Sequence, residues 1–347
     1  MTVYYMAIFL FIFAACGLVA DTNVTSVYED TYIDRAHSVI SDKVVDYSDN
    51  VDIALSEMLK NSDENVTAIK INKKQSADAF FRSDKFFQET DETYVSVRLD
   101  SNFNSTGTSN FNIAVNARLP LSRSTKEYNL FINDLNQNNF NDIIKRESID
   151  KQSRIEIGIN YFAPLFYEMK SKYSIGTNGI NPFVLARYTI RKKFYTWKIE
   201  PIQSFKYSLK DHFEEETKIY FDKPLGEFRL FRIDLHRSTK AKHSGMDYGL
   251  ALEHYWILKD NTGLSVSQSF FGNTKYEYST NNSLIPQETK SDGGITNYTT
   301  SLSYRRSVWR KWFFYGVTPN VNFQKQYGYK TNFGLNFFID LYFGSIK

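Results

Sequence analysis

The chain has 347 residues, of which 23% are charged, with a net charge of +3 and a mean hydropathy of −0.43. This small, evenly spread charge gives no argument for a nucleic-acid partner, and the polar average excludes a bundle of membrane-spanning helices, each of which needs about 20 consecutive apolar residues. The unusual feature is an aromatic share of 16%, with 29 Phe and 24 Tyr, which suits strands whose alternate residues face lipid.

Residues 1–20 are expected to be a secretory signal peptide. Met6–Ala15 is apolar but too short to span a bilayer, and Leu18–Ala20 offers a cleavage site. The only cysteine, Cys16, leaves an alternative open, because a lipoprotein signal would carry its lipid there. Cleavage after Ala20 would instead leave a mature protein without thiols, which fits an oxidising periplasm.

Residues 21–91 are expected to form a periplasmic helical segment and a linker. Apolar residues recur every three or four positions from Ile33 to Val44 and again from Val51 to Met58, which predicts helix between residues 27 and 61. The charge-rich remainder predicts a linker with a further helix near Ala77–Phe87. The apolar stripe can pack within a small hairpin, on the mouth of a barrel or inside its lumen, and these alternatives stay open.

From Thr93 onward the hydrophobic period changes to two. In the first such run Val95 and Val97 alternate with Ser96 and Arg98. About fourteen runs of this kind lie near 93–104, 109–119, 127–135, 153–163, 166–176, 181–190, 194–208, 212–222, 226–237, 245–258, 261–273, 295–306, 310–322 and 331–343. Runs of about 9–11 residues can cross a membrane as tilted strands. We therefore predict an all-β membrane protein, an antiparallel transmembrane β-barrel over residues 92–347 with about fourteen strands, or twelve if the weak fifth and sixth runs fail.

The connections between the runs indicate an orientation. An even strand count places both ends of the barrel in the periplasm. Long connections, near 136–151, 238–244 and 274–294, then lie outside the cell, and short ones, at Ala163–Leu165, Arg191–Lys193 and Lys223–Leu225, lie inside. All four tryptophans, Trp197, Trp256, Trp309 and Trp312, fall at the periplasmic interface, where such rings are favoured as anchors. The basic turn around Trp309 is interpreted as part of this anchor, with docking of an acidic partner as the alternative.

Charged side chains in the strands are expected to point into the lumen, because a charge facing lipid is costly. Alternation predicts a lumen-lining set of Arg98, Arg118, Arg154, Arg187, Lys198, Glu200, Glu214, Glu216, Lys218, Arg232, Asp234, Glu253 and Arg305, with Glu156, Lys206 and Asp340 on the same faces. Glu214, Glu216 and Lys218 are expected to pair across a hairpin with Arg232 and Asp234. Three interpretations remain: satisfied ion pairs, a charged constriction that selects solutes, or a catalytic carboxylate pair.

The sequence predicts no cofactor, no metal site and no enzyme. His236 near Asp234 and His212 beside Asp211 could activate water, but no serine lies in a recognised nucleophile setting. The five histidines and the lone cysteine show no metal-ligand spacing.

Three segments carry a resemblance to a known family: Asp78–Leu99 (DAFFRSDKFFQETDETYVSVRL), Ile180–Tyr188 (INPFVLARY) and Tyr304–Phe323 (YRRSVWRKWFFYGVTPNVNF), the last followed by a strand ending in LYFG. They resemble uncharacterised proteobacterial outer-membrane β-barrel proteins with an N-terminal helical segment. The resemblance implies a Gram-negative outer membrane as the compartment and no particular activity. Asn332, Gly334, Phe337 and Ile339 fit the spacing that the barrel-assembly machinery reads, although four residues follow Phe343.

The expected function is a passive, porin-like channel or transporter for small hydrophilic solutes. Its expected partners are outer-membrane lipids, lipopolysaccharide, the barrel-assembly machinery and the solute itself. The expected location is the outer membrane, with the N-terminal segment in the periplasm. Two alternatives stay open: a structural or surface-binding barrel with a closed lumen, and an outer-membrane hydrolase.

Overall fold

The computed structural model describes residues 31–59, 80–81, 93–105, 109–121, 128–134, 155–259, 261–279 and 289–345. The predicted signal peptide, Cys16 and Arg154 lie outside these residues, as does most of the predicted linker. The chain divides into two compact units, Met1–Ser38 and Val39–Lys347. Within the described residues, no helix is both long and apolar enough to cross a membrane.

Helix α2 (Tyr32–Leu59) occupies the N-terminal region in which the sequence predicts a helix. Its first turn is fixed by a reciprocal capping box. The Thr31 backbone N–H donates to Asp34 Oδ2 at 3.0 Å, and the Asp34 N–H donates back to Thr31 Oγ1 at 3.4 Å. The helix therefore begins at Tyr32, a few residues later than the apolar spacing alone suggests.

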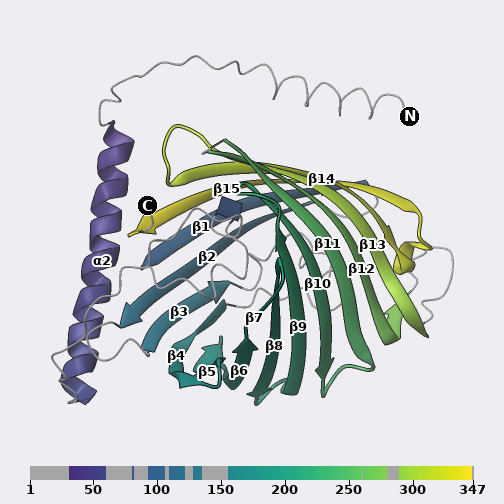
Figure 1. The fold of residues 1–347 in the computed structure, drawn as a ribbon, viewed down its shortest axis with the longest axis horizontal. Coiled ribbons are helices and arrows are strands. Elements are labelled where there is room, and N and C mark those ends of the chain that lie inside the picture. The colour runs from purple at the N-terminus through teal and green to yellow at the C-terminus, as the bar shows by residue number, and fades with distance from the viewer. Residues whose placement is uncertain are drawn as a thin grey trace. The chain divides into compact units, whose positions relative to one another are not determined.

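The described strands between residues 94 and 344 form one antiparallel sheet that closes into a barrel (Figure 1). Its strands are β1 (Tyr94–Asn104), β2 (Asn110–Leu121), β3 (Tyr128–Asp134), β4 (Ile155–Phe166), β5 (Met169–Asn178), β6 (Asn181–Ile190), β7 (Lys192–Phe194), β8 (Trp197–Ser208), β9 (His212–Pro224), β10 (Arg229–Lys240), β11 (Met246–Lys259), β12 (Thr262–Ser279), β13 (Thr289–Ser307), β14 (Phe313–Gln324) and β15 (Thr331–Gly344). The short β7 continues β6 after Arg191, and both pair with β8, so the two fill one position. The barrel has fourteen strands, which confirms the predicted count.

Alternation along each strand separates a polar inner face from an apolar outer one. On β15, Asn332, Asn336 and Asp340 are buried, whereas Phe333 and Phe337 are 52% and 38% exposed. A protein folded in water would show the opposite arrangement, because large apolar side chains would be buried and the polar ones exposed. Polar residues inside and apolar residues outside are the arrangement of a barrel whose solvent is lipid.

The barrel end at which β1 starts and β15 ends is called the terminal rim here, and the opposite end the far rim. At the terminal rim the connections are Tyr167–Glu168, Tyr195–Thr196, Leu225–Phe228 and Val308–Trp312, besides two connections that are not fully described. The predicted turns at Ala163–Leu165, Arg191–Lys193 and Lys223–Leu225 were wrong by two to four residues. The strands run on through them.

The reason for these errors lies in the turn residues. Tyr167 and Glu168 have φ of 45° and 66°, so they form the tight turn in a left-handed conformation that glycine or asparagine usually adopts. Pro164, which suggested a turn, instead lies where the register of β4 and β5 shifts. A residue without an N–H is tolerated at such a bulge.

At the far rim the strands also extend beyond expectation. The connection predicted over 274–294 is largely strand, because β12 continues to Ser279 and β13 starts at Thr289. Irregular pairing between Phe271 and Tyr276 allows this extension. Residues 136–151 lie outside the described part of the chain.

Candidate functional site: the charged interior of the barrel

The predicted lumen residues lie at the inward positions of their strands. Each shares a face with buried residues of its own strand or of the strand paired with it: Arg98, Arg118, Arg187, Lys198, Glu200, Glu214, Glu216, Lys218, Arg232, Asp234, Glu253 and Arg305. Only Arg154 lies outside the described residues. Whether these side chains border a water-filled pore stays a prediction. Their contacts divide them into three groups.

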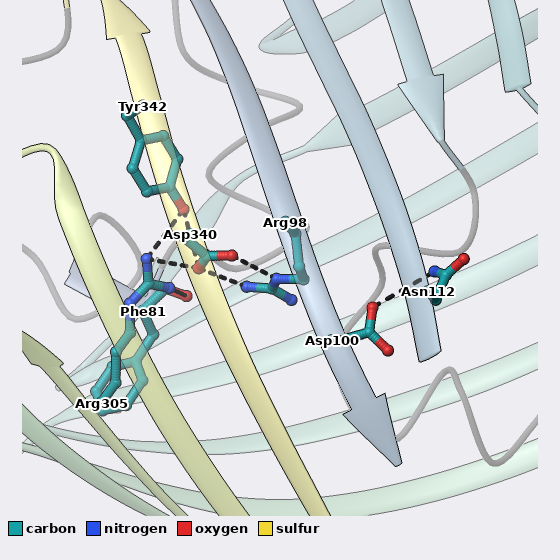
Figure 2. Close-up of polar contacts among 7 residues, drawn as sticks. All are labelled: Phe81, Arg98, Asp100, Asn112, Arg305, Asp340 and Tyr342. Carbon is teal, nitrogen blue, oxygen red and sulfur yellow. Dashed lines mark hydrogen bonds and ion pairs between the residues drawn. The ribbon is translucent and has the colours of Figure 1, made fainter. Parts of the chain in front are cut away.

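The first group fastens the seam at which β1 and β15 close the barrel (Figure 2). Arg98 lies directly opposite Asp340 and donates two hydrogen bonds to its carboxylate, at 2.5 and 2.7 Å. Arg305 reaches the same carboxylate at 3.0 Å and donates to the hydroxyl of Tyr342 at 2.9 Å. We call Arg98, Arg305, Asp340 and Tyr342 the seam network.

Aromatic rings enclose the seam network. The Arg98 guanidinium lies 4.5 Å from the ring centre of Phe338, and that of Arg305 lies 4.5 Å from the ring centre of Phe314. The side chains of Arg305 and Asp340 are only 2% and 1% exposed. Such charges are stable inside a protein only when they are paired and hydrogen-bonded, and stacking on the rings adds to this.

The second group lies on β9 and β10. Arg232 forms a two-bond pair with Asp222 at 2.6 and 2.8 Å, with both side chains at most 6% exposed. The predicted pairing of Arg232 with Glu214 and Glu216 was wrong, because the turn ending at Phe228 sets a register in which Arg232 faces Asp222. Asp222 was missed, although alternation beyond Lys218 would have indicated its inward position.

The third group gathers at the half of the barrel nearer the far rim, and we call it the charged wall: Glu156, Lys206, Glu216, Lys218 and His236. Lys206 Nζ lies 2.5 Å from Glu156 Oε1, Lys218 Nζ lies 3.3 Å from Glu216 Oε1, and His236 Nε2 lies 3.1 Å from the same oxygen. Two of its side chains, Glu216 at 31% and Lys206 at 19% exposed, keep more exposure than Arg305 and Asp340 of the seam network. Because these side chains point inward, solvent must reach them from within the barrel.

Most other members of the predicted set have local partners. Arg191 donates to Glu200 at 2.8 Å, and the Tyr255 hydroxyl donates to Glu253 at 2.8 Å. Arg187 donates to the hydroxyl of Ser204 at 3.1 Å. These contacts fit structural pairing and reveal no nucleophile beside a base.

The described residues offer no cluster suited to a metal ion, and the histidines that the sequence singled out lie apart from one another. No group of three or more His, Cys, Asp or Glu side chains there could hold a metal ion. His236 contacts Glu216, and His212 lies where β9 begins, at the far rim. The absence of enzyme activity remains a prediction.

The four tryptophans all lie near the terminal rim. Trp197 begins β8, Trp256 lies near the end of β11, and Trp309 and Trp312 lie in the β13–β14 turn with ring centres 5.9 Å apart. Cations accompany them, since Lys223 lies 5.4 Å from the Trp197 ring centre and Arg310 5.4 Å from that of Trp309. This grouping is what membrane-interface anchors require, and the anchoring role itself stays a prediction.

The closed fourteen-strand sheet, the apolar outer face and the polar interior together decide the class of fold. The chain is a β-barrel of the outer-membrane type. No protein-family model and no curated protein matches it.

Solved structures similar to this barrel include the KdgM porin in complex with disordered oligogalacturonate, with 8% identity over 73% of this chain and 99% of that chain, at a TM-score of 0.34. OmpT of Vibrio cholerae is 8% identical over 73% of this chain and 97% of its own, with a TM-score of 0.41. OccK11 (OpdR) of Pseudomonas aeruginosa is 7% identical over 73% of this chain and 95% of its own, also with a TM-score of 0.41. These are outer-membrane barrels too. Likeness this weak transfers no function, and it does not confirm the particular family that the sequence segments resemble.

Proposed function

We propose that the barrel is a passive outer-membrane channel for small hydrophilic solutes, with the charged wall at the entrance to its path. The observation that carries this proposal is the difference in exposure between inward side chains. Glu216 is 31% exposed, whereas Asp340 is 1% exposed. Solvent therefore reaches Glu216 more freely than it reaches the carboxylate at the seam, and a polar solute could follow it.

The charged wall suits selection by charge. Its cations and anions lie a few ångströms apart on the inward faces of β4, β8, β9 and β10, so a permeating solute would meet a transverse field and long side chains that narrow its path. An even strand count brings the first and last strands' termini to the same rim, which lies in the periplasm in bacterial barrels. In the proposed orientation the terminal rim therefore faces the periplasm and the far rim faces the outside of the cell. The N-terminal segment then lies in the periplasm.

The double substitution Glu214→Gln and Glu216→Gln tests this proposal. It removes two inward carboxylates and makes the net charge of this region more positive, so the anion-to-cation permeability ratio should rise roughly twofold or more. The stability loss should be about 1 kcal/mol or less, because Glu216 is partly solvated. Reversal potentials in a salt gradient across a planar bilayer measure the ratio.

The matched control is Glu168→Gln, which removes a carboxylate from the exposed Lys192–Glu168 pair in a terminal-rim turn. This variant should keep the selectivity of the wild type. An unchanged ratio in the double variant would contradict the assignment of the charged wall to the pore. A complete lack of current in every form would instead favour a structural or surface-binding barrel with a closed lumen, which the tight packing at the seam also supports.

A further inference from the structure

A pair of aromatic residues from outside the sheet lies inside the terminal rim. Phe80 is only 5% exposed and packs in a cluster with Ile257, Phe314 and Tyr342. Its ring meets that of Phe314 edge-on, with centroids 6.1 Å apart. Phe81 lies beside it and packs against Tyr255 with ring centroids 5.0 Å apart.

The barrel wall leaves a gap for these two rings at Gly263. A Cβ atom at this position would lie 2.5 Å from Phe80 Cε1 and 2.8 Å from Phe81 Cζ, which is too close for any side chain. Gly263 is the second residue of β12, and no left-handed backbone angle explains it. A glycine within a strand often marks the close approach of another group, and here that group is the Phe80–Phe81 pair.

A buried donor completes the site. Arg305 Nη1 donates to the backbone oxygen of Phe81 at 2.7 Å, while its Nη2 contacts the Tyr342 hydroxyl and the Asp340 carboxylate (Figure 2). The hydrogen bond to a main-chain oxygen fixes the position of the peptide as well as that of the rings. It also joins the pair to the seam network, in which Arg305 and Asp340 are almost fully buried.

We infer that the terminal rim contains a peptide-binding site for a Phe–Phe segment and that Phe80–Phe81 fills it as a latch. An apolar wall, a glycine gap and a buried donor all match the same two residues. The latch ties the N-terminal segment to the interior of the barrel and restricts the pore at that rim. Only the restriction of the pore rests on the proposed channel function.

Two variants of the full chain disrupt the latch from opposite sides. Phe80→Ala with Phe81→Ala removes the occupant, and Gly263→Val fills the gap without touching the segment. The first readout is tryptic cleavage after Arg82, the next residue in the chain, followed by mass spectrometry. Both variants should be cut at least about tenfold faster than the wild type, because a protease acts on the opened state, and the burial of Phe80 and the packing of Phe81 keep that state rare. The second readout is single-channel conductance in a planar bilayer, which should rise in both variants.

Phe228→Ala is the matched control, since Phe228 is an exposed phenylalanine in a turn at the same rim. It should leave cleavage and conductance unchanged. Cleavage of both variants at the wild-type rate would overturn the latch. Faster cleavage with unchanged conductance would overturn its restriction of the pore. No current in any form would contradict the channel, while the cleavage rates would still decide whether the latch exists.

Discussion

Asp340→Asn is expected to lower the free energy of unfolding by about 3–5 kcal/mol, the range typical of removing one partner from a buried ion pair. Asparagine keeps the shape of the side chain but removes the charge that Arg98 and Arg305 share. Both guanidinium groups would then stay inside the barrel without that counterion. Since Arg98 and Asp340 face each other across the β1–β15 pairing, the loss falls on the contact that closes the barrel.

Denaturant unfolding in lipid vesicles, followed by tryptophan fluorescence, measures this loss, and the heat-modifiable gel shift of the folded barrel gives an independent check. Glu168→Gln is again the matched control. It breaks an ion pair whose two side chains are each 62% exposed, and it should leave stability unchanged. A loss of less than about 1 kcal/mol for Asp340→Asn would show that the seam network does not hold the barrel closed.

Ile159→Arg is expected to destabilise the barrel in lipid by about 2–4 kcal/mol, the cost of an arginine facing the middle of a bilayer. Ile159 lies in an apolar row with Leu130, Ile175 and Val184, which face one another in register on β3, β4, β5 and β6. Its side chain points outward and is 43% exposed. An arginine there would have to enter lipid or displace its neighbours.

Phe228→Arg provides the depth control for this prediction. Phe228 is also exposed, but it lies in a terminal-rim turn, where the cost of a charge should fall to about 0–1 kcal/mol. The same unfolding assay compares the two variants. Equal costs at the two positions would contradict the assignment of this outer surface to a membrane.

The sequence predicted the barrel well because one physical rule governs it. Lipid outside and polar side chains inside force a period of two, and this period is visible in single strands such as β14, where buried and less buried residues alternate without a break. The even strand count and the common level of the tryptophans follow from the same runs. Even the weak fifth and sixth runs proved to be β5 and β6.

Turns and cross-strand partners were harder to predict, because they depend on register. Tyr167 and Glu168 form a tight turn without the glycine or asparagine that usually reveals one. A shift of one or two residues at such a turn changes every partner along the hairpin. For this reason the inward face of Arg232 was predictable, whereas its pairing with Asp222 was not.

The latch left only indirect signs in the sequence. Phe80 and Phe81 lie in a segment that resembles other barrel proteins, but no periodicity relates two residues before the first strand to Gly263 or Arg305. Such a contact joins parts of the chain that are far apart, and only the folded structure brings them together. Gly263 gave the one local hint, because it lies within a run that otherwise follows the strand pattern.

The most direct test of the channel is the current through planar bilayers that contain the purified full-length protein and, separately, its Phe80→Ala/Phe81→Ala variant. We expect ion current whose selectivity responds to Glu214→Gln and Glu216→Gln, with larger conductance in the latch variant. No current from either form, at protein concentrations where the folded barrel is shown to be inserted, would contradict it.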